Sequence, residues 1–342
     1  MTLNANVAGA GPQNPDLTVI MVSHNTREMT LTAIRSLYEQ TQETSFELIV
    51  LDNASSDGSA EAIANAFPQA RLIRSADNLG FARANNMAAE QARGRWLLLL
   101  NPDTEIYDRA VDRLVAFAEA HPAHKVYGGR TVYPDGSLNA HSCLGAVTPW
   151  SAFCRAVGLS ALFPKSALFN SEMIGGWKRD SIREIDVVVG CFLLIPLAFW
   201  RKLGGFDLDY WMYGEDYDLC IRAKACGARP VIVPEATIMH VFGASSASRA
   251  EKLVPLLRAR STLIDRHWPV WQRPWGRFAN WLWIASRAGF ATALCALPTR
   301  RFEGMRALWL PVWRARAIWM QGYPRSAGEP ARASLRAEQP RI

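Results

Sequence analysis

Short apolar runs alternate with amphipathic segments along the first third of the chain. Apolar runs of about four to eight residues between polar turns are typical of strands buried on both faces. Apolar residues that recur every three or four positions indicate helices instead. Strands and helices that alternate at this spacing form βαβ units, so the pattern predicts a mostly parallel sheet. The expected strands are 17–23, 46–52, 71–74 and 96–100. The expected helices are 26–38, 59–67, 80–94 and 108–121.

The pattern changes in the second third of the chain. Residues 138–184 show no regular period and are expected to be irregular. Residues 185–195 are typical of a strand, which Gly190 interrupts. A helix is expected at 214–226, and Gly227 can end it in the left-handed conformation. The remaining expected elements are short strands at 230–233 and 237–241 and a helical region from 249 to 322.

The strand at 96–100 runs directly into the turn N-P-D-T, which carries a carboxylate. Pro102 cannot continue a strand ladder. Asp103 is therefore left at the carboxyl end of a buried strand, the edge where open α/β sheets bind ligands. There it could hold a divalent cation against a phosphate. Asn, Pro and Asp also favour turns for local reasons, so the turn by itself leaves both interpretations open.

Two further turns and one strand end carry candidate residues. Asp52 ends the second strand, where it could accept hydrogen bonds from a base or ribose, or form an Asx turn. The segment N-L-G-F-A-R places Asn78, Gly80 and Arg83 at a helix start, which favours a phosphate but also suits an ordinary helix. His240 ends a short strand and could be a nitrogen ligand to a cation or a structural histidine.

The segment G-E-D-Y-D packs three carboxylates, Glu215, Asp216 and Asp218, into the start of the helix at 214–226. Aromatic residues that include Trp211 and Tyr213 surround it. Clustered carboxylates beside aromatic walls suit general-base catalysis and sugar binding. The structural alternative is that negative charge at a helix start is favoured by the helix dipole.

Several classes of protein are excluded by missing motifs. No G-x-G-x-x-G follows the first strand and no G-x-x-x-x-G-K-[ST] occurs, so neither a dinucleotide fingerprint nor a P-loop is present. The six cysteines form no C-x-x-C pair, which argues against a zinc site and indicates a reducing compartment. The first 15 residues lack the basic start and apolar core of a secretory signal and are expected to be a disordered leader.

Charge is distributed unevenly around the net value of +7. Residues 249–342 hold 17 Lys and Arg against 5 Asp and Glu, and 8 of the 13 tryptophans lie beyond residue 266. Such a segment suits nucleic acid or an anionic membrane surface. Residues 278–298 are long enough to span a bilayer, but Arg287 at their centre makes a span costly. We therefore expect 278–298 and 302–321 to be helices that lie on a membrane or pack on the preceding part of the chain.

Taken in order, these motifs resemble the family 2 glycosyltransferases with the GT-A fold, and most of all their bacterial rhamnosyltransferase-like branch. The resemblance covers about residues 16–250. It rests on V-I-M-V-S-H-N, L-D-N-A-S-S-D-G-S, N-L-G-F-A-R-A-N-N, L-L-L-L-N-P-D-T, G-C-F-L-L-I-P, Y-G-E-D-Y-D-L-C and H-V-F-G-A-S. It implies an α/β fold of GT-A type, Rossmann-like with a mostly parallel sheet, and a C-terminal helical extension. The expected parts are a leader at 1–15, a catalytic domain at 16–250, a basic Trp-rich extension at 251–322 and a disordered tail at 323–342.

The resemblance also implies roles for the motif residues. Asp216 would be the catalytic base with Glu215 beside it, and Asp103 would bind Mg²⁺ or Mn²⁺ with His240 as a further ligand. Asn101 replaces the first Asp of the D-x-D motif, which removes one negative charge from the metal site, and His24 stands where many members carry an aromatic residue. The donor is expected to contact Ser23, His24, Asn25, Asp52, Asn78, Arg83, Asn101 and Asp103. The acceptor is expected to contact Gly190, Trp211 and Tyr213.

The implied activity is the inverting transfer of a sugar from a nucleotide-diphosphate donor to a glycan or lipid-linked acceptor in bacterial cell-surface polysaccharide synthesis. One candidate donor is dTDP-rhamnose. The expected location is the bacterial cytoplasm or the cytoplasmic face of the inner membrane, so an anionic membrane surface, and no nucleic acid, is expected as a partner. Two alternatives remain, a sugar nucleotidyltransferase and a non-catalytic membrane-associated scaffold.

Overall fold

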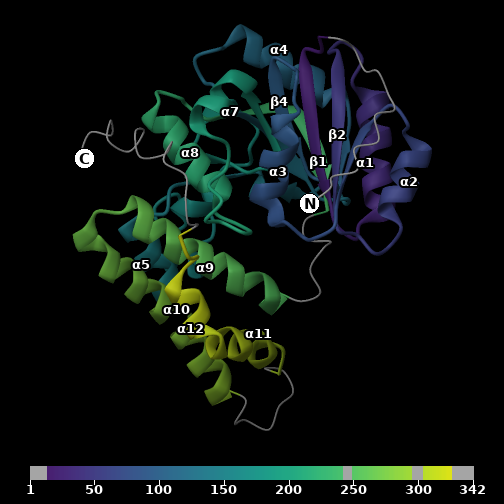
Figure 1. Cartoon of the computed structure of the whole chain (residues 1–342). Coiled ribbons are helices and arrows are strands. Elements are labelled where there is room, and N and C mark those ends of the chain that lie inside the picture. The colour runs from purple at the N-terminus through teal and green to yellow at the C-terminus, as the bar shows by residue number, and fades with distance from the viewer. Residues whose placement is uncertain (1–13, 242–248, 295–302, 326–342) are drawn as a thin grey trace.

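The structure is a computed structural model that describes residues 14–241, 249–294 and 303–325. A sheet with helices on both faces forms the larger part, and Figure 1 shows the C-terminal helices gathered on one side of it. Most of the expected leader, and residues 326–342 of the expected tail, lie outside the described residues.

The first half of the chain forms the parallel part of the sheet, as the sequence predicts. Its strands lie side by side in the order β3-β2-β1-β4, and each neighbouring pair is parallel. These strands are β1 (Leu17–Ser23), β2 (Phe46–Asn53), β3 (Arg71–Ser75) and β4 (Trp96–Leu100). The helices that connect and follow them are α1 (Arg27–Gln40), α2 (Ser59–Ala66), α3 (Gly80–Glu90) and α4 (Ala110–Ala120).

The second half extends the sheet from β4 in the order β11-β6-β12-β5 and makes it mixed. Here β11 is antiparallel to β4 and β6, while β12 is parallel to β6. The two short strands expected near residues 230–241 form the single strand β12, whose register shifts between Val233 and Thr237. The main strands are β5 (Thr104–Ile106), β6 (Tyr127–Val132), β11 (Phe192–Pro196) and β12 (Val231–His240). The shorter ones are β7 (Leu138–Asn139), β8 (Cys143–Leu144), β9 (Arg183–Glu184) and β10 (Val187–Val188).

The apolar strands are buried because helices cover both faces of the sheet. Leu98 and Leu100 of β4 point into the cluster that α1, α2 and α4 close. Leu97 and Leu99, one position away, point into the cluster that α3, α7 (Leu197–Leu203) and α8 (Glu215–Ala225) close. Successive side chains of a strand point to opposite faces, so a strand covered on both faces must be apolar throughout.

One edge of the sheet gathers the ends of several strands. The parallel pairing of β1 with β2 and β4 brings their carboxyl ends to this edge. Because β11 is antiparallel to β4, with Phe192 opposite Leu100, the start of β11 lies there too. The strand directions place the end of β12, at His240, on the same edge.

The segment 138–184 contains more regular structure than its sequence pattern suggests. Thr148 and Ser151 form a reciprocal capping box at the start of α5 (Pro149–Val157). This T-P-W-S start is a local helix signal that the search for periodicity missed. The other elements of the segment are α6 (Leu159–Leu162), η1 (Ala140–Ser142) and η2 (Ser171–Met173).

The C-terminal region is helical, as expected, and packs on α5. Trp283 and Trp319 lie inside a cluster that also contains Ala152 and Ala156 of α5, so packing accounts for these tryptophans. Within the described ranges, no helix is both long enough and apolar enough to cross a membrane. The helices are α9 (Arg249–His267), η3 (Val270–Gln272), α10 (Arg273–Leu294), α11 (Glu303–Arg314) and α12 (Arg316–Gln321).

Buried ion pairs join this basic region to the more acidic sheet domain. Arg260 of α9 donates to both carboxylate oxygens of Glu172, at 2.6 and 2.8 Å, and Arg155 donates to the same group at 2.7 Å. Although burial opposes it, Arg155 and Arg260 hold the pKa of Glu172 well below its usual range. Arg266 of α9 likewise pairs with Asp209. Part of the positive charge of the C-terminal region therefore serves to attach it to the sheet domain.

Candidate functional site

The first turn at the sheet edge follows β1. Ser23 is buried, and its hydroxyl hydrogen-bonds with Thr30 of α1 at 2.9 Å, so it holds the helix rather than lining an open surface. His24 Nδ1 donates to the carbonyl of Asn53 at 2.8 Å. Asn25 has a positive φ of 53°, and its side chain accepts from the backbone of Ser56 at 2.8 Å. His24 and Asn25 thus tie the β1 turn to the β2 turn.

The second turn presents a buried carboxylate. Asp52 is 4% exposed, and one of its oxygens accepts from the backbone N–H of Ser55 at 3.2 Å. The other oxygen, Oδ1, has no hydrogen-bond partner among the described residues. A buried carboxylate oxygen without a donor is costly, so it suits a ligand that brings an N–H or O–H group.

Asn53 organises the neighbouring turn, a role that the sequence analysis did not assign. Its side chain donates to Asn78 Oδ1 at 3.0 Å and accepts from the backbone of Leu79 at 2.8 Å. Asn78 in turn accepts from the backbone N–H of Gly80 at 3.0 Å. The only signal in the sequence was the position of Asn53 directly after Asp52. Arg83 lies one turn further along α3 and is exposed.

Gly80 is required by a close contact with Trp211. Its φ is +73°, and a Cβ atom there would lie 2.4 Å from the carbonyl oxygen of Trp211 and 2.7 Å from its indole ring. The same carbonyl accepts from the backbone N–H of Phe81 at 3.2 Å. The glycine that the sequence analysis assigned to a phosphate therefore also lets the loop of Trp211 dock on the start of α3.

The turn after β4 meets the end of β12. Asp103 Oδ1 lies 3.2 Å from His240 Nε2, and Asn101 Nδ2 lies 3.4 Å from the same nitrogen. Asp103 is 9% exposed and His240 is 3% exposed. Burial lowers the pKa of His240, but Cys191 and Asp103 raise it, to about 10 overall. The structure thus brings together the two residues predicted as metal ligands, Asp103 and His240, which are more than 130 positions apart in the sequence, and Asn101 lies beside them.

The donor set of this turn suits a divalent cation that accepts oxygen and nitrogen ligands. A carboxylate and an imidazole are ligands of Mn²⁺ in proteins, and the amide of Asn101 can add an oxygen. The described residues contain no group of three or more His, Cys, Asp or Glu side chains placed to hold a metal. The protein would thus supply only part of a coordination shell, and a phosphate-bearing ligand would supply more.

Two carboxylates of the G-E-D-Y-D segment have raised pKa values. Burial raises the pKa of Asp216 to about 6, against hydrogen bonds from the backbone of Tyr217 and Gly190. Burial and the charge of Asp216 raise the pKa of Glu215 to about 8. Glu215 is 5% exposed, and its Oε2 has no hydrogen-bond partner within the described residues.

Asp218, the third carboxylate of that segment, has a different environment. Arg222 Nε donates to it at 2.7 Å, and His267 Nε2 of α9 lies 2.9 Å from its other oxygen. Despite burial, Arg222 and His267 hold its pKa well below the usual range. Asp218 therefore attaches α8 to the C-terminal region, whereas Glu215 and Asp216 form no ion pair with an Arg, Lys or His side chain among the described residues.

The fold and the edge together define a class of protein. A parallel half-sheet whose strand ends gather at one edge, extended by a mixed half-sheet, is the architecture of the GT-A glycosyltransferases. The model of the family described as "Glycosyl transferase family 2" matches residues 18–185. Residues 18–185 thus form a glycosyltransferase family 2 domain, and the chain is an enzyme that transfers a glycosyl group, so the nucleotidyltransferase and scaffold alternatives are set aside.

Named relatives agree with this assignment. The chain is 28% identical over 254 residues to "N-acetylglucosaminyl-diphospho-decaprenol L-rhamnosyltransferase" of Mycobacterium tuberculosis (strain CDC 1551 / Oshkosh), covering 66% of this chain and 77% of the relative. It is 27% identical over 243 residues to "Succinoglycan biosynthesis protein ExoO" of Rhizobium meliloti (strain 1021), covering 70% and 64%. These relatives place the chain among glycosyltransferases of bacterial glycan biosynthesis.

A solved structure confirms the GT-A fold. The mannosyltransferase PcManGT from Pyrobaculum calidifontis, in complex with GDP-Man and Mn²⁺, superposes with a TM-score of 0.54. The match covers 93% of this chain and 90% of that chain at 18% identity. At this identity the likeness concerns the fold alone.

Proposed function

We propose that this enzyme transfers a sugar, with inversion, from a nucleotide-diphosphate donor to a lipid-linked acceptor in bacterial cell-surface polysaccharide synthesis. One observation carries the proposal: Asp216 accepts a hydrogen bond from the backbone of Gly190, just before β11, and the neighbouring Cys191 binds the backbone of Asn101 in the turn that holds Asp103 beside His240. A base, a nucleotide contact and a metal–diphosphate contact are the three parts that such a transfer needs.

The donor lies along the ends of β1, β2 and β4 in this proposal. Asp52 Oδ1, buried and without a partner in the described residues, accepts a hydrogen bond from the base or ribose. His24 and Asn25 shape the wall of that pocket through their contacts with the β2 turn. Asn78 and the exposed Arg83 border the diphosphate. We propose dTDP-rhamnose as the first donor to test, because rhamnosyltransferases are among the named relatives.

Asp103 and His240 would hold Mg²⁺ or Mn²⁺, with Asn101 beside them. Bound there, the cation would neutralise the negative charge that builds on the diphosphate as it leaves. Asn101 adds no charge, so the site carries one negative charge fewer than a pair of aspartates would. Affinity for the cation alone is therefore expected to be modest, and to rise when the donor's phosphates are present.

Asp216 acts as the general base. It takes the proton from the acceptor hydroxyl while that oxygen attacks the anomeric carbon from the face opposite the leaving diphosphate. One new bond to the anomeric carbon forms as the bond to the diphosphate breaks, so the configuration inverts. Burial raises the pKa of Asp216 and so makes it a stronger base than an exposed aspartate.

We also propose that the enzyme works at an anionic membrane surface. An aromatic surface, made of Trp150, Phe163, Trp271, Trp275 and Phe278, has side chains that are 41–78% exposed. The rings of Trp275 and Phe278 are in contact, with centroids 6.0 Å apart. The ring of Phe153 contacts both Trp275 and Trp150 and so connects them. Tryptophan and phenylalanine on one exposed face suit the membrane interface.

Positive charge borders this aromatic surface. From Phe278 the ring contacts pass through Trp281 to Trp313, with centroids 5.9–6.0 Å apart. The guanidinium of Arg316 lies 4.9 Å from the centre of the Trp313 ring, and Arg316 and Arg314 are exposed. Arginines beside interfacial aromatics attract anionic lipid headgroups. A lipid-linked acceptor would then reach the enzyme within its own membrane.

The test of the proposed activity uses Asp216→Asn in the full chain. Loss of the base is expected to lower kcat by at least about a thousandfold, while the affinity for the donor's nucleoside diphosphate in the presence of Mn²⁺ stays within about twofold of the parent. Transfer is measured by release of the nucleoside diphosphate, and binding by calorimetry. Asp218→Asn is unsuitable as a control because Asp218 holds α8 and α9 together. Turnover by Asp216→Asn close to that of the parent would remove Asp216 as the base.

A further inference from the structure

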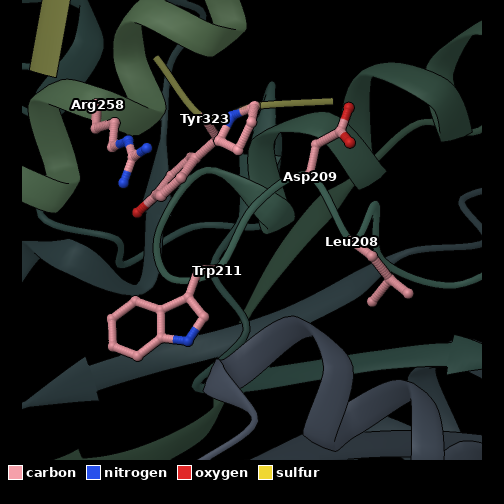
Figure 2. Close-up of a pocket in the computed structure, with 6 residues that line it drawn as sticks. Leu208, Asp209, Trp211, Arg258 and Tyr323 are labelled. Carbon is pink, nitrogen blue, oxygen red and sulfur yellow. The ribbon is translucent and has the colours of Figure 1, made fainter. Parts of the chain in front are cut away.

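A pocket outside the sheet edge lies between the sheet domain and the C-terminal region. It has a volume of about 290 Å³, close to the lower range for ligand sites. Its walls come from the loop before α8, from the middle of α9 and from the chain that follows α12. The lining residues are Leu208, Asp209, Trp211, Arg258, Tyr323 and Pro324. Figure 2 shows Trp211 on one side of this pocket and Arg258 with Tyr323 on the other.

Trp211 is a fixed and accessible platform. Its carbonyl is held by the N–H of Phe81, and its indole rests on Gly80, yet the residue is 47% exposed. A half-exposed indole held on a rigid base offers an apolar face to a ligand at little cost in side-chain entropy. This is a surface on which a sugar ring can lie.

Arg258 lies on the side of the pocket opposite Trp211 (Figure 2), and its guanidinium has N–H donors that are available to a ligand. Its Nε donates to the carbonyl of Gly322 at 2.9 Å, and its guanidinium carbon lies 4.7 Å from the centre of the Tyr323 ring. These contacts fix the stem and the plane of the guanidinium. Within the described residues, its two terminal nitrogens make no hydrogen bond. A guanidinium held in this way suits an oxyanion, because two parallel N–H groups match two oxygens.

The remaining charges of the pocket leave Arg258 available. Asp209, the one carboxylate in the lining, forms an ion pair with Arg266 of α9, whose side chain is 9% exposed. Tyr323 is held by two hydrogen bonds, from its N–H to Thr262 Oγ1 at 2.7 Å and from its hydroxyl to the carbonyl of Met212 at 2.8 Å. The pocket therefore presents a net positive group beside an aromatic face.

The pocket borders the proposed catalytic base. Trp211 and Met212 lead directly into Tyr213, Gly214 and the Glu215–Asp216 pair. The hydroxyl of Tyr323 donates to the carbonyl of Met212 at 2.8 Å, and its ring packs in a cluster with Tyr213 and Tyr217, which flank this pair in the sequence. On its other side, Trp211 touches the α3 start that is proposed to border the donor's diphosphate. A ligand in the pocket would thus lie close both to the proposed base and to the proposed donor site.

We propose that this pocket binds the sugar-phosphate part of the acceptor, with the sugar on Trp211 and its attached phosphate on Arg258. The inference rests on the proposed function and deepens it, because it commits the acceptor to a glycosyl phosphate or diphosphate. A neutral glycan could offer the terminal nitrogens of Arg258 only hydroxyl oxygens, which form weaker hydrogen bonds with a guanidinium than phosphate oxygens do. It also makes the C-terminal region part of the substrate site, since Arg258 and Tyr323 both belong to it.

Arg258→Gln in the full chain tests the proposal. The probe is N-acetylglucosaminyl diphosphate carrying a short alkyl chain, and the matched neutral probe is the same alkyl N-acetylglucosaminide without the diphosphate. Loss of the guanidinium is expected to weaken binding of the diphosphate probe at least about tenfold and to leave the neutral probe within about twofold. Binding is measured by calorimetry, with the melting temperature of each variant as a check on folding.

Arg83→Gln is the matched control, because Arg83 is an exposed arginine that is proposed to border the donor. It is expected to weaken donor binding and leave the diphosphate probe unaffected, the reverse of Arg258→Gln. Equal affinity of Arg258→Gln and parent for the diphosphate probe would overturn the proposal. The proposal would also be overturned if Arg258→Gln lowered the affinity for the nucleotide-sugar donor and left the affinity for the diphosphate probe unchanged.

A second measurement does not depend on any variant. In hydrogen exchange on the parent protein, the diphosphate probe is expected to protect the segments at 207–213 and 256–262. Absence of protection in both segments would overturn the pocket assignment. The two proposals remain distinguishable: a parent protein that neither binds nor cleaves any nucleotide sugar contradicts the proposed function, whereas one that does so without these responses contradicts only the pocket.

Discussion

Glu215 shows how burial of a carboxyl group changes its pKa and, through the pKa, the stability of the fold. Its pKa is raised from the usual 4.5 to about 8, first by burial and then by the charge of Asp216. Below pH 4.5 the carboxyl is neutral in both folded and unfolded chains and has no effect. Between pH 4.5 and 8 the unfolded chain loses the proton while the folded chain keeps it, so stability falls as the pH rises.

Glu215→Gln is therefore expected to stabilise the fold relative to the parent at pH 8.5 by about 4 kcal/mol more than at pH 5. Urea denaturation at the two pH values measures the difference in free energy of unfolding. The comparison between pH values cancels any fixed packing cost of the amide. A difference between variant and parent that is the same at both pH values would contradict the raised pKa.

Asp103 carries the second prediction at this scale. Asp103→Ala is expected to lower the affinity for the nucleotide in the presence of Mn²⁺ at least about tenfold and to leave metal-free binding within about twofold, because the carboxylate acts through the cation. Calorimetry with and without Mn²⁺ measures both values. Nucleotide affinity in the parent that is unchanged by Mn²⁺ would remove the proposed metal role of Asp103 and His240.

Among the elements, α9 attaches the C-terminal region to the sheet domain through charges buried at the contact. Arg260 and Arg155 share the carboxylate of Glu172, and Arg260 Nε also donates to Asn280 of α10 at 2.8 Å. Glu172 and Arg260 are 4% and 7% exposed. Removing the anion would leave two cations without compensation in a buried site.

Glu172→Gln is expected to lower the free energy of unfolding by about 3–5 kcal/mol, as observed when one partner of a buried ion pair is removed. Glu61→Gln is the control, because Glu61 pairs with Arg74 on the surface, and it is expected to leave the denaturation midpoint unchanged. Urea denaturation followed by circular dichroism measures both. A midpoint for Glu172→Gln that matches the control would show that the cluster does not stabilise the fold.

At the scale of the whole molecule, the C-terminal region has two surfaces with different contacts. Its inner surface, with Trp283 and Trp319, packs on α5. Its outer surface carries the exposed aromatic residues and arginines proposed to meet a membrane. Deleting residues 270–342 would remove Asn280 and Tyr323 along with Trp271, Trp275 and Phe278 of the aromatic surface, so point substitutions are the sharper test.

The triple variant Trp271→Ser, Trp275→Ser and Phe278→Ser is expected to bind phosphatidylglycerol-containing vesicles at least about tenfold more weakly than the parent. Its activity on a water-soluble acceptor is expected to stay within about twofold. Exposed aromatic side chains contribute to interfacial binding by burial in the headgroup region. Co-sedimentation measures binding, and Tyr107→Ser, an exposed aromatic residue elsewhere on the sheet domain, is the control. A parent protein that does not sediment with these vesicles would contradict the membrane proposal.

The sequence alone was sufficient for the alternation of strands and helices, the GT-A fold and the glycosyltransferase family. Local periodicity carries this information, because a strand covered on both faces, such as Trp96–Leu100, must be apolar at every position. It also indicated that Asp52 and Asp103 lie at strand ends, since pairing direction brings those ends to one edge.

Only the tertiary structure decided which distant residues meet. Nothing near Tyr323 in the sequence indicates that it packs in a cluster with Tyr213, and nothing in G-E-D-Y-D distinguishes Asp218, neutralised by Arg222 and His267, from Asp216. Asn53 and Arg258 acquire their roles in the same way, from partners on other elements. The reason is physical: local pattern depends on neighbours along the chain, whereas a buried charge or a pocket depends on side chains that only packing brings together.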